Sequence, residues 1–244
     1  MEKTETLNKV TTALNVDFGD ENTIWLTNSL TLRKVIGILG MSLPLLLFVF
    51  MYIDNGLSHP LQSISHYYYT RVASVFVVIL SILAIFLIIY KGKEPIDFFI
   101  SLAAGLFALC VVFFPTDNIA EPCCNQFPLS VTTLKNSPFR EGFHYISAGI
   151  FLGCLAYMSL FLFTKSDKSQ QERGSKKIIR NRIYRVCGVF MIAAILVIGA
   201  GYFELISKTF YDSNQLTFWM ETVAVESFGL SWLIKGETLF KDAK

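Results

Sequence analysis

The sequence predicts an all-α polytopic membrane protein, a bundle of six transmembrane helices with both termini on the cytoplasmic side. Three observations predict it. The chain of 244 residues is 53% hydrophobic and only 16% charged, well below the roughly 25% charged content of soluble domains. It contains six apolar stretches, each long enough to cross a hydrocarbon core of about 30 Å. Its Lys and Arg residues gather in alternate links between those stretches.

The expected spans lie between a polar cytoplasmic arm, residues 1–32, and a short cytoplasmic tail, residues 237–244. No apolar run follows Met1 closely enough to form a secretory signal, so the first apolar stretch is expected to stay in the membrane. The spans form one transmembrane domain, residues 33–236, and cover residues 35–53, 72–90, 96–114, 143–163, 186–203 and 216–234.

Local signals delimit several of these spans. Pro44 falls inside the first, which a membrane helix tolerates. The second ends at Lys91-Gly92-Lys93, and the third ends before Pro115. The fourth has a good start signal, since Ser137 is a typical N-cap and Pro138 suits the first helical position. Small residues four apart, at Gly149 and Gly153 in the fourth span and at Ser101 and Gly105 in the third, predict close helix packing, within one subunit or between subunits.

Orientation follows from the basic residues. The 164–185 link carries eight Lys and Arg residues, whereas the 54–70 link carries none. Short links rich in Lys and Arg stay in the cytoplasm. The 91–95 link and the tail after residue 234 are also basic, so an orientation with both termini inside places all the basic ends on one side. Nucleic-acid binding is not expected, because the basic 164–185 link lacks interleaved aromatic residues.

The last span is unusual because it contains two acids, Glu221 and Glu226. A carboxylate in hydrocarbon is costly unless it is paired, hydrated or protonated, and such groups usually mark a functional site. Trp219, Thr222 and Glu226 share one helix face, and Glu221 lies about 140° away around the helix. We therefore expect Glu226 at the centre of a site and Glu221 at its rim, facing Arg71 or Arg140.

Other polar groups reach the same outer leaflet in this topology. Two of the three histidines and several acids open or close spans there, and Tyr67 would donate to a bound anion. Ser63 and Ser65 come just before the tyrosines. These outer residues are Ser63, Ser65, His66, Tyr67, Arg71, Asp117, Glu141, His144 and Glu204.

Three interpretations of this constellation remain open. It is an interfacial belt of paired polar groups, a cavity for an ion or small solute with Glu226 at its floor, or a metal site. In the last case His66, Asp117 and His144 would hold zinc, Glu221 or Glu226 would act as general base, and Ser65 is a further catalytic candidate. No HxxxH or HExxH pair is present, and no cofactor other than zinc is expected.

Three functions follow from these interpretations. The first is an outward-facing polar cavity that binds or passes an ion or small polar solute. The second is a metal-dependent hydrolase acting on a lipid or amide at the outer leaflet, and the third is a homo-oligomeric pore-forming effector. The expected partners are the bilayer, an ion, solute or lipid ligand, and further copies of the chain.

Cys123 and Cys124 would face an oxidising compartment, which favours a disulfide.

Four stretches carry a resemblance to known proteins: residues 63–69 (SISHYYY), 114–116 (FPT), 181–185 (NRIYR) and 221–236. Together they resemble an uncharacterised group of bacterial six-span integral membrane proteins, which implies a six-helix fold in the bacterial cytoplasmic (inner) membrane and no particular activity. A looser analogy is to the alkaline ceramidase and adiponectin-receptor-like membrane hydrolases.

That analogy rests on four positions, because those hydrolases use a serine, an aspartate and three histidines. Ser63 or Ser65, His66, Asp117 and His144 resemble that set. The last span of this chain carries acids where those hydrolases have paired histidines.

Overall fold

A computed structural model describes residues 28–117, 130–132, 134–165 and 175–240. These residues are mostly helical, and one isolated β-bridge joins Thr70 to Ser130. The elements are α2 (Ser29–Asn55), η2 (Ile64–Tyr69), α3 (Ala73–Ile89), α4 (Pro95–Phe113), α5 (Pro138–Tyr157), η3 (Met158–Leu162), α6 (Ser175–Tyr202), α7 (Lys208–Ser213) and α8 (Leu216–Lys235).

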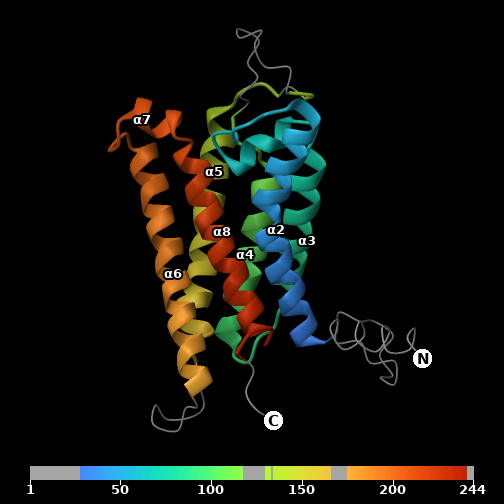
Figure 1. Ribbon diagram of the computed structural model, residues 1–244, viewed down its shortest axis with the longest axis vertical. Helices are drawn as coiled ribbons and strands as arrows, with labels where there is room; N and C mark the ends of the chain where they lie inside the picture. The colour runs from blue at the N-terminus through green and yellow to red at the C-terminus, as the bar shows by residue number, and fades with distance from the viewer. Residues whose placement is uncertain (1–27, 118–129, 133, 166–174, 241–244) are drawn as a thin grey trace, which may run out of the picture.

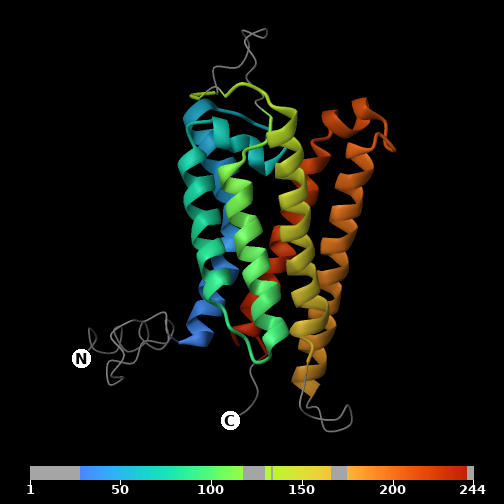
Figure 2. The same cartoon turned by 180° about the vertical axis from the view of Figure 1, so that it is seen from behind.

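The six long helices form an up-and-down bundle of two layers (Figures 1 and 2). One layer is α2, α8 and α6, with α8 in the middle, and the other is α3, α4 and α5. Contacts between α2 and α3 and between α5 and α6 close the two layers against each other. The last helix of the chain is therefore packed between the first and the fifth, which the sequence order alone does not reveal.

Four helical segments are long and apolar enough to cross a membrane: Ser29–Asp54, Pro95–Phe113, Pro138–Leu162 and Ser175–Tyr202. Their outer faces carry large exposed apolar side chains, which suit a lipid environment. Helix α3 is apolar but has only 17 residues. Helix α8 has 20 residues, two of them glutamates, and is not among the four.

Capping explains where the helices begin. The expected start of the fourth span is confirmed, because Ser137 is the N-cap of α5 and Pro138 follows at the first helical position. Asn28 accepts hydrogen bonds from the first backbone N–H groups of α2. Glu94 and Asp97 form a capping box at α4. These side chains satisfy N–H groups that have no partner within the helix.

Three features differ from the sequence-based expectation. Helix α6 begins at Ser175 and not near residue 186, because the basic residues before the apolar stretch are themselves good helix formers. Helix α5 continues as the π-helical turn η3. The outer links contain the short helices η2 and α7. Each has only six residues, which is too few for a periodic hydrophobic pattern to predict a helix.

Glycines set the closest helix contacts, though not those expected in the fourth span. A Cβ atom on Gly149 or Gly153 would meet no described atom within 4 Å, so these glycines make no close helix contact within the described residues of one subunit. The close contact joins α2 to α8, where a Cβ atom on Gly37 would lie 2.8 Å from the carbonyl oxygen of Gly229. At Gly105 of α4 a Cβ atom would lie 2.6 Å from the carbonyl oxygen of Ala84 in α3.

Candidate functional site

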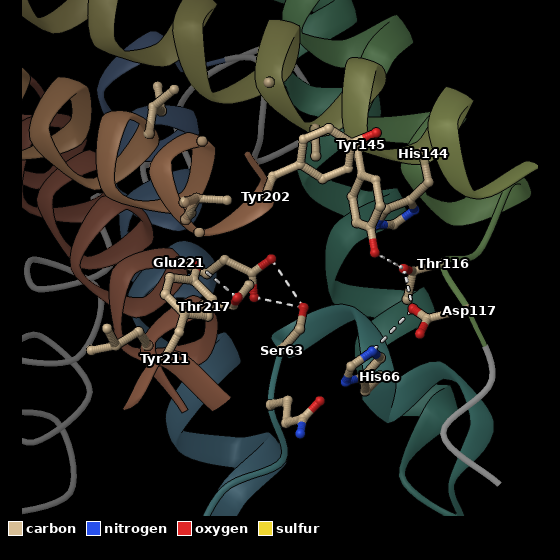
Figure 3. A pocket seen from close by; sticks show the side chains of 18 of the residues that line it. Ser63, His66, Thr116, Asp117, His144, Tyr145, Tyr202, Tyr211, Thr217 and Glu221 are labelled. Carbon is tan, nitrogen blue, oxygen red and sulfur yellow. Dashed lines mark hydrogen bonds and ion pairs between the residues drawn. The ribbon is translucent and has the colours of Figure 1, made fainter. Parts of the chain in front are cut away.

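The candidate site is a cavity of about 680 Å³ at the α7 end of the bundle. Its lining residues come from α5, α6, α7 and α8, from η2, and from the segments before η2 and after α4. Figure 3 labels ten of the lining residues: Ser63, His66, Thr116, Asp117, His144, Tyr145, Tyr202, Tyr211, Thr217 and Glu221. Glu204, Lys208 and Asp212 also line the cavity. The sequence scatters these residues over more than 150 positions, and the bundle brings them together.

Glu221 forms one side of the cavity and binds the start of η2. Its carboxylate accepts a hydrogen bond of 2.7 Å from the backbone N–H of Ile64, and the Ser63 hydroxyl lies 2.9 and 3.0 Å from its two oxygens. The backbone N–H of Phe218 donates to the carbonyl of Gln62 at 2.9 Å. These bonds join α8 to η2. Glu221 therefore binds the N-terminus of η2 and not Arg71 or Arg140, which were its expected partners.

A chain of hydrogen bonds forms the opposite side (Figure 3). The His66 Nε2 lies 3.3 Å from Asp117 Oδ1, and the Thr116 hydroxyl donates to the same oxygen at 2.8 Å. The Tyr145 hydroxyl is 3.3 Å from the Thr116 hydroxyl. The Tyr69 hydroxyl donates to the Thr116 carbonyl at 2.6 Å, which fixes the segment after α4 against η2 and thereby positions Asp117.

The His144 ring is almost fully buried and connects two further groups. Its Nδ1 lies 2.8 Å from the carbonyl oxygen of Phe114, and because a carbonyl only accepts, Nδ1 carries the proton. In the neutral ring Nε2 then accepts from the Ser65 hydroxyl, 3.1 Å away. A serine bound to a histidine nitrogen is the arrangement of a nucleophile and its base, but Ser65 is buried and does not line the cavity.

The lining is acidic and aromatic in character. It contains four acids, Asp117, Glu204, Asp212 and Glu221, against one lysine, Lys208. Three tyrosines from α5, α6 and α7, Tyr145, Tyr202 and Tyr211, also line it. Carboxylates attract cations, and the faces of aromatic rings bind them as well. The cavity is therefore suited to a small ligand that carries a positive charge.

The expected central role of Glu226 needs correction. Glu226 does not line the cavity; it is half-buried on the same α8 face as Trp219 and Val223, which are 48% and 36% exposed. The opposite side of α8 is buried, with Phe228 and Trp232 in the core. Core packing therefore fixes the rotation of the helix, and it turns the Glu226 face outward and leaves Glu221 beside the cavity.

Other expected site residues also lie outside the cavity lining. The Tyr67 ring is fully buried against Phe218, 6.2 Å away, and its hydroxyl accepts from the backbone of Leu61. Arg71 is exposed, and its Nε lies 3.9 Å from Asp54. The Thr222 hydroxyl is buried without a hydrogen-bond partner. Cys123 and Cys124 fall outside the described residues.

The three expected metal ligands divide between two contacts. His66 binds Asp117, whereas His144 binds Ser65 and a backbone carbonyl. Within the described part of the chain, no group of three or more His, Cys, Asp or Glu side chains could hold a metal ion. The His66 Nδ1 atom is buried without a partner, so a water or a polar ligand atom near it would complete its hydrogen bonding.

Several lining residues escape a sequence-based search for ionisable groups. Thr116, Tyr145, Tyr202, Tyr211 and Thr217 are neutral and occur near helix ends, where such residues are common. The Thr217 hydroxyl donates to Tyr211 at 2.9 Å, and this bond holds α7 against the start of α8. The sequence signal that could have identified these lining residues is that the tyrosines and threonines occur near the same span ends as the acids.

The His66–Asp117 contact predicts a loss of stability in acid. The hydrogen bond from His66 outweighs burial and lowers the pKa of Asp117 from 3.8 to about 2. A carboxyl group with a lowered folded-state pKa stabilises the protein above its unfolded pKa, and this stability is lost as the pH falls from about 4 to 2. Because the Asp117 side chain is 39% exposed, solvent screening leaves about 1 kcal/mol of it.

Unfolding of the purified protein at pH 5 and at lower pH measures this loss. Asp117→Asn is expected to flatten the acid limb of the stability curve by that amount. His66→Asn serves as the control, because Asp117 then keeps only the hydrogen bond from Thr116 and the further change Asp117→Asn should flatten the acid limb much less. An acid limb that is the same in all four proteins would contradict the prediction.

In comparisons with known proteins, no family model, no curated protein and no solved structure matches the chain.

Proposed function

We propose that this protein is a six-span membrane protein whose cavity binds a small polar solute carrying a positive charge. The observation that carries the proposal is the lining: four acids, two histidines and three tyrosines around about 680 Å³, with one lysine. That volume falls within the usual range of small-molecule sites, about 300–1,000 Å³. An amine or quaternary ammonium group would meet carboxylates and aromatic faces together.

Alternating helix direction supports six spans. Helices α2 and α4 run the same way, so α3 must carry the chain back across the same thickness (Figure 1). The last helix returns to the level of the first, because Arg33 donates to the carbonyl of Lys235. The basic links lie at that end, which favours both termini in the cytoplasm and the cavity outside. Labelling of a cysteine at Lys208 by an impermeant maleimide in intact cells tests this orientation.

Binding is favoured over conduction and over hydrolysis. Beyond the cavity the bundle is filled by buried apolar side chains, among them Leu155, Phe228 and Trp232, and such packing resists the passage of a charged solute. The Ser65 hydroxyl, the most obvious nucleophile, is enclosed beside His144 and does not line the cavity. Placement in the inner membrane of a bacterium is part of the proposal and follows from the resemblance described above.

Two matched variants test the proposal in lipid nanodiscs. Choline and ethanolamine serve as cationic probes, acetate as an anionic one, and calorimetry or a thermal shift measures binding. Glu221→Gln removes the carboxylate from the cavity and is expected to weaken binding of the cations at least tenfold. Glu226→Gln makes the same change on the same helix outside the cavity and should leave the affinity unchanged. Equal binding of both cations by wild type and Glu221→Gln, or no binding of either, would refute the proposal.

A further inference from the structure

A second, smaller cavity of about 100 Å³ lies at the other end of the bundle. It is formed where α2 begins, where α8 ends, and beside the link between α3 and α4. Its lining contains four basic and two acidic side chains together with two aromatic rings: Arg33, Lys93, Lys165, Lys235, Glu94, Asp97, Tyr90 and Phe163.

Both acids of this cavity are already occupied. The Lys165 ammonium lies 2.6 Å from Glu94 Oε2 and 3.3 Å from Asp97 Oδ1. The other oxygen of Asp97 accepts from the backbone N–H groups of Lys93 and Glu94, at 2.9 and 3.2 Å. The two acids of this cavity therefore serve the start of α4 and one lysine, and neither of them pairs with Arg33 or Lys235.

Arg33 and Lys235 are held in place by groups that do not neutralise them. The Arg33 guanidinium lies 5.7 Å from the centre of the Tyr90 ring, and the Lys235 ammonium 5.3 Å from that of Phe163. Among the described residues, no carboxylate oxygen lies within 4.0 Å of the charged nitrogens of either residue. The Arg33 Nε is buried without a hydrogen-bond partner, so its N–H group could donate to a bound ligand.

The charges around Lys235 are mostly of its own sign. Among the described residues, Arg33, Lys93 and Lys177 repel the Lys235 ammonium, and Asp97 attracts it. Positive charges gathered in a half-buried cavity repel one another more strongly than they would in water. An anion that accepts hydrogen bonds from several of these groups would remove both the repulsion and the missing partner of Arg33 Nε.

We propose that this cavity binds a phosphate group. The Arg33 guanidinium offers the fork of donors that matches phosphate oxygens, and Lys235 adds a point charge. The cavity volume of about 100 Å³ equals that of about three water molecules in the liquid, at about 30 Å³ each, which is room for a phosphate group. Two sources share this chemistry: the headgroup of an anionic phospholipid, whose attraction to basic clusters beside membrane spans is general, and free inorganic phosphate.

Thermal unfolding of the detergent-purified full chain tests the proposal and separates the two sources. The ligands are phosphatidylglycerol, phosphatidylcholine as its zwitterionic control, and inorganic phosphate against chloride at equal ionic strength. Ligand that binds the folded protein raises Tm. A rise with phosphatidylglycerol above that with phosphatidylcholine identifies a lipid headgroup, and a rise with phosphate above that with chloride identifies the free ion.

Lys235→Gln and Arg33→Gln are each expected to remove at least half of that rise. Lys91→Gln and Arg182→Gln change exposed basic residues at the same end of the bundle outside the cavity, and they should leave it intact. Without ligand, Lys235→Gln should have a Tm no lower than wild type, because it relieves repulsion. The proposal is overturned if neither ligand raises Tm beyond its control, if Lys91→Gln reduces the rise as much as Lys235→Gln does, or if Lys235→Gln lowers the basal Tm and keeps the rise.

Discussion

Replacing Glu221 by alanine is expected to destabilise the protein by about 3 kcal/mol. The substitution leaves the backbone N–H of Ile64 and the hydroxyl of Ser63 without their acceptor, and each buried unsatisfied group costs about 1–3 kcal/mol. Glu221→Gln keeps an oxygen that accepts from Ile64, so we expect it to lose only about 1 kcal/mol. Equilibrium unfolding in detergent measures both differences.

A local measurement separates this effect from a general loss of packing. Hydrogen exchange at the Ile64 amide should become faster in Glu221→Ala and stay slow in Glu221→Gln. Glu226→Ala is the control on the same helix, because Glu226 lies on the outward face, and it should change stability by no more than about 0.5 kcal/mol. Slow exchange at Ile64 in Glu221→Ala would show that this bond does not hold η2.

Gly229→Ala is expected to cost about 2 kcal/mol of stability. A Cβ atom at this position would lie 2.8 Å from the carbonyl oxygen of Gly37 and 2.4 Å from the side chain of Met41. The carbonyl belongs to the α2 backbone and cannot rotate away as a side chain can, so α2 and α8 must separate. Overpacking of this kind costs about 1–3 kcal/mol, and equilibrium unfolding of the purified variant measures it.

Gly153→Ala is the matched control, since it makes the same change where a Cβ atom meets no described atom within 4 Å. Because alanine favours helix more than glycine does, we expect this variant to gain about 0.5 kcal/mol. Gly37→Ala should resemble Gly229→Ala, and the double variant should cost less than the two single costs added, because one separation of the helices accommodates both methyl groups. Equal effects of Gly229→Ala and Gly153→Ala would contradict the proposed contact.

The sequence pattern predicts how far along the bundle a side chain lies more reliably than it predicts toward which side of its helix that side chain points. Apolar length and basic links put His66, Asp117, His144 and Glu221 near one end of the bundle, and these four line one cavity. The same pattern gives no reason to prefer Glu221 over Glu226. It favoured Glu226 because Trp219 and Thr222 share its face, whereas packing of the opposite side of α8 turns that face outward.

The sequence pattern also did not predict the short helix η2 or the contacts between helices that are far apart in the chain. Helix η2 offers its N-terminal N–H groups to Glu221, and six residues carry no periodic signal that would announce it. The contact of Gly37 with Gly229 joins residues almost two hundred positions apart, so spacing along the chain does not reveal it.

The sequence by itself determined that this chain is helical and apolar enough for a membrane, and where its long helices lie, because composition and the length of apolar runs depend on local chemistry. It also placed Ser137 and Pro138 at the start of α5, since capping involves only neighbouring residues. Only the tertiary structure decided which side of α8 meets the cavity and which cations near Lys235 lack a carboxylate. Those outcomes depend on contacts between helices far apart in the chain, and the rotation of each helix is set by all of its neighbours together.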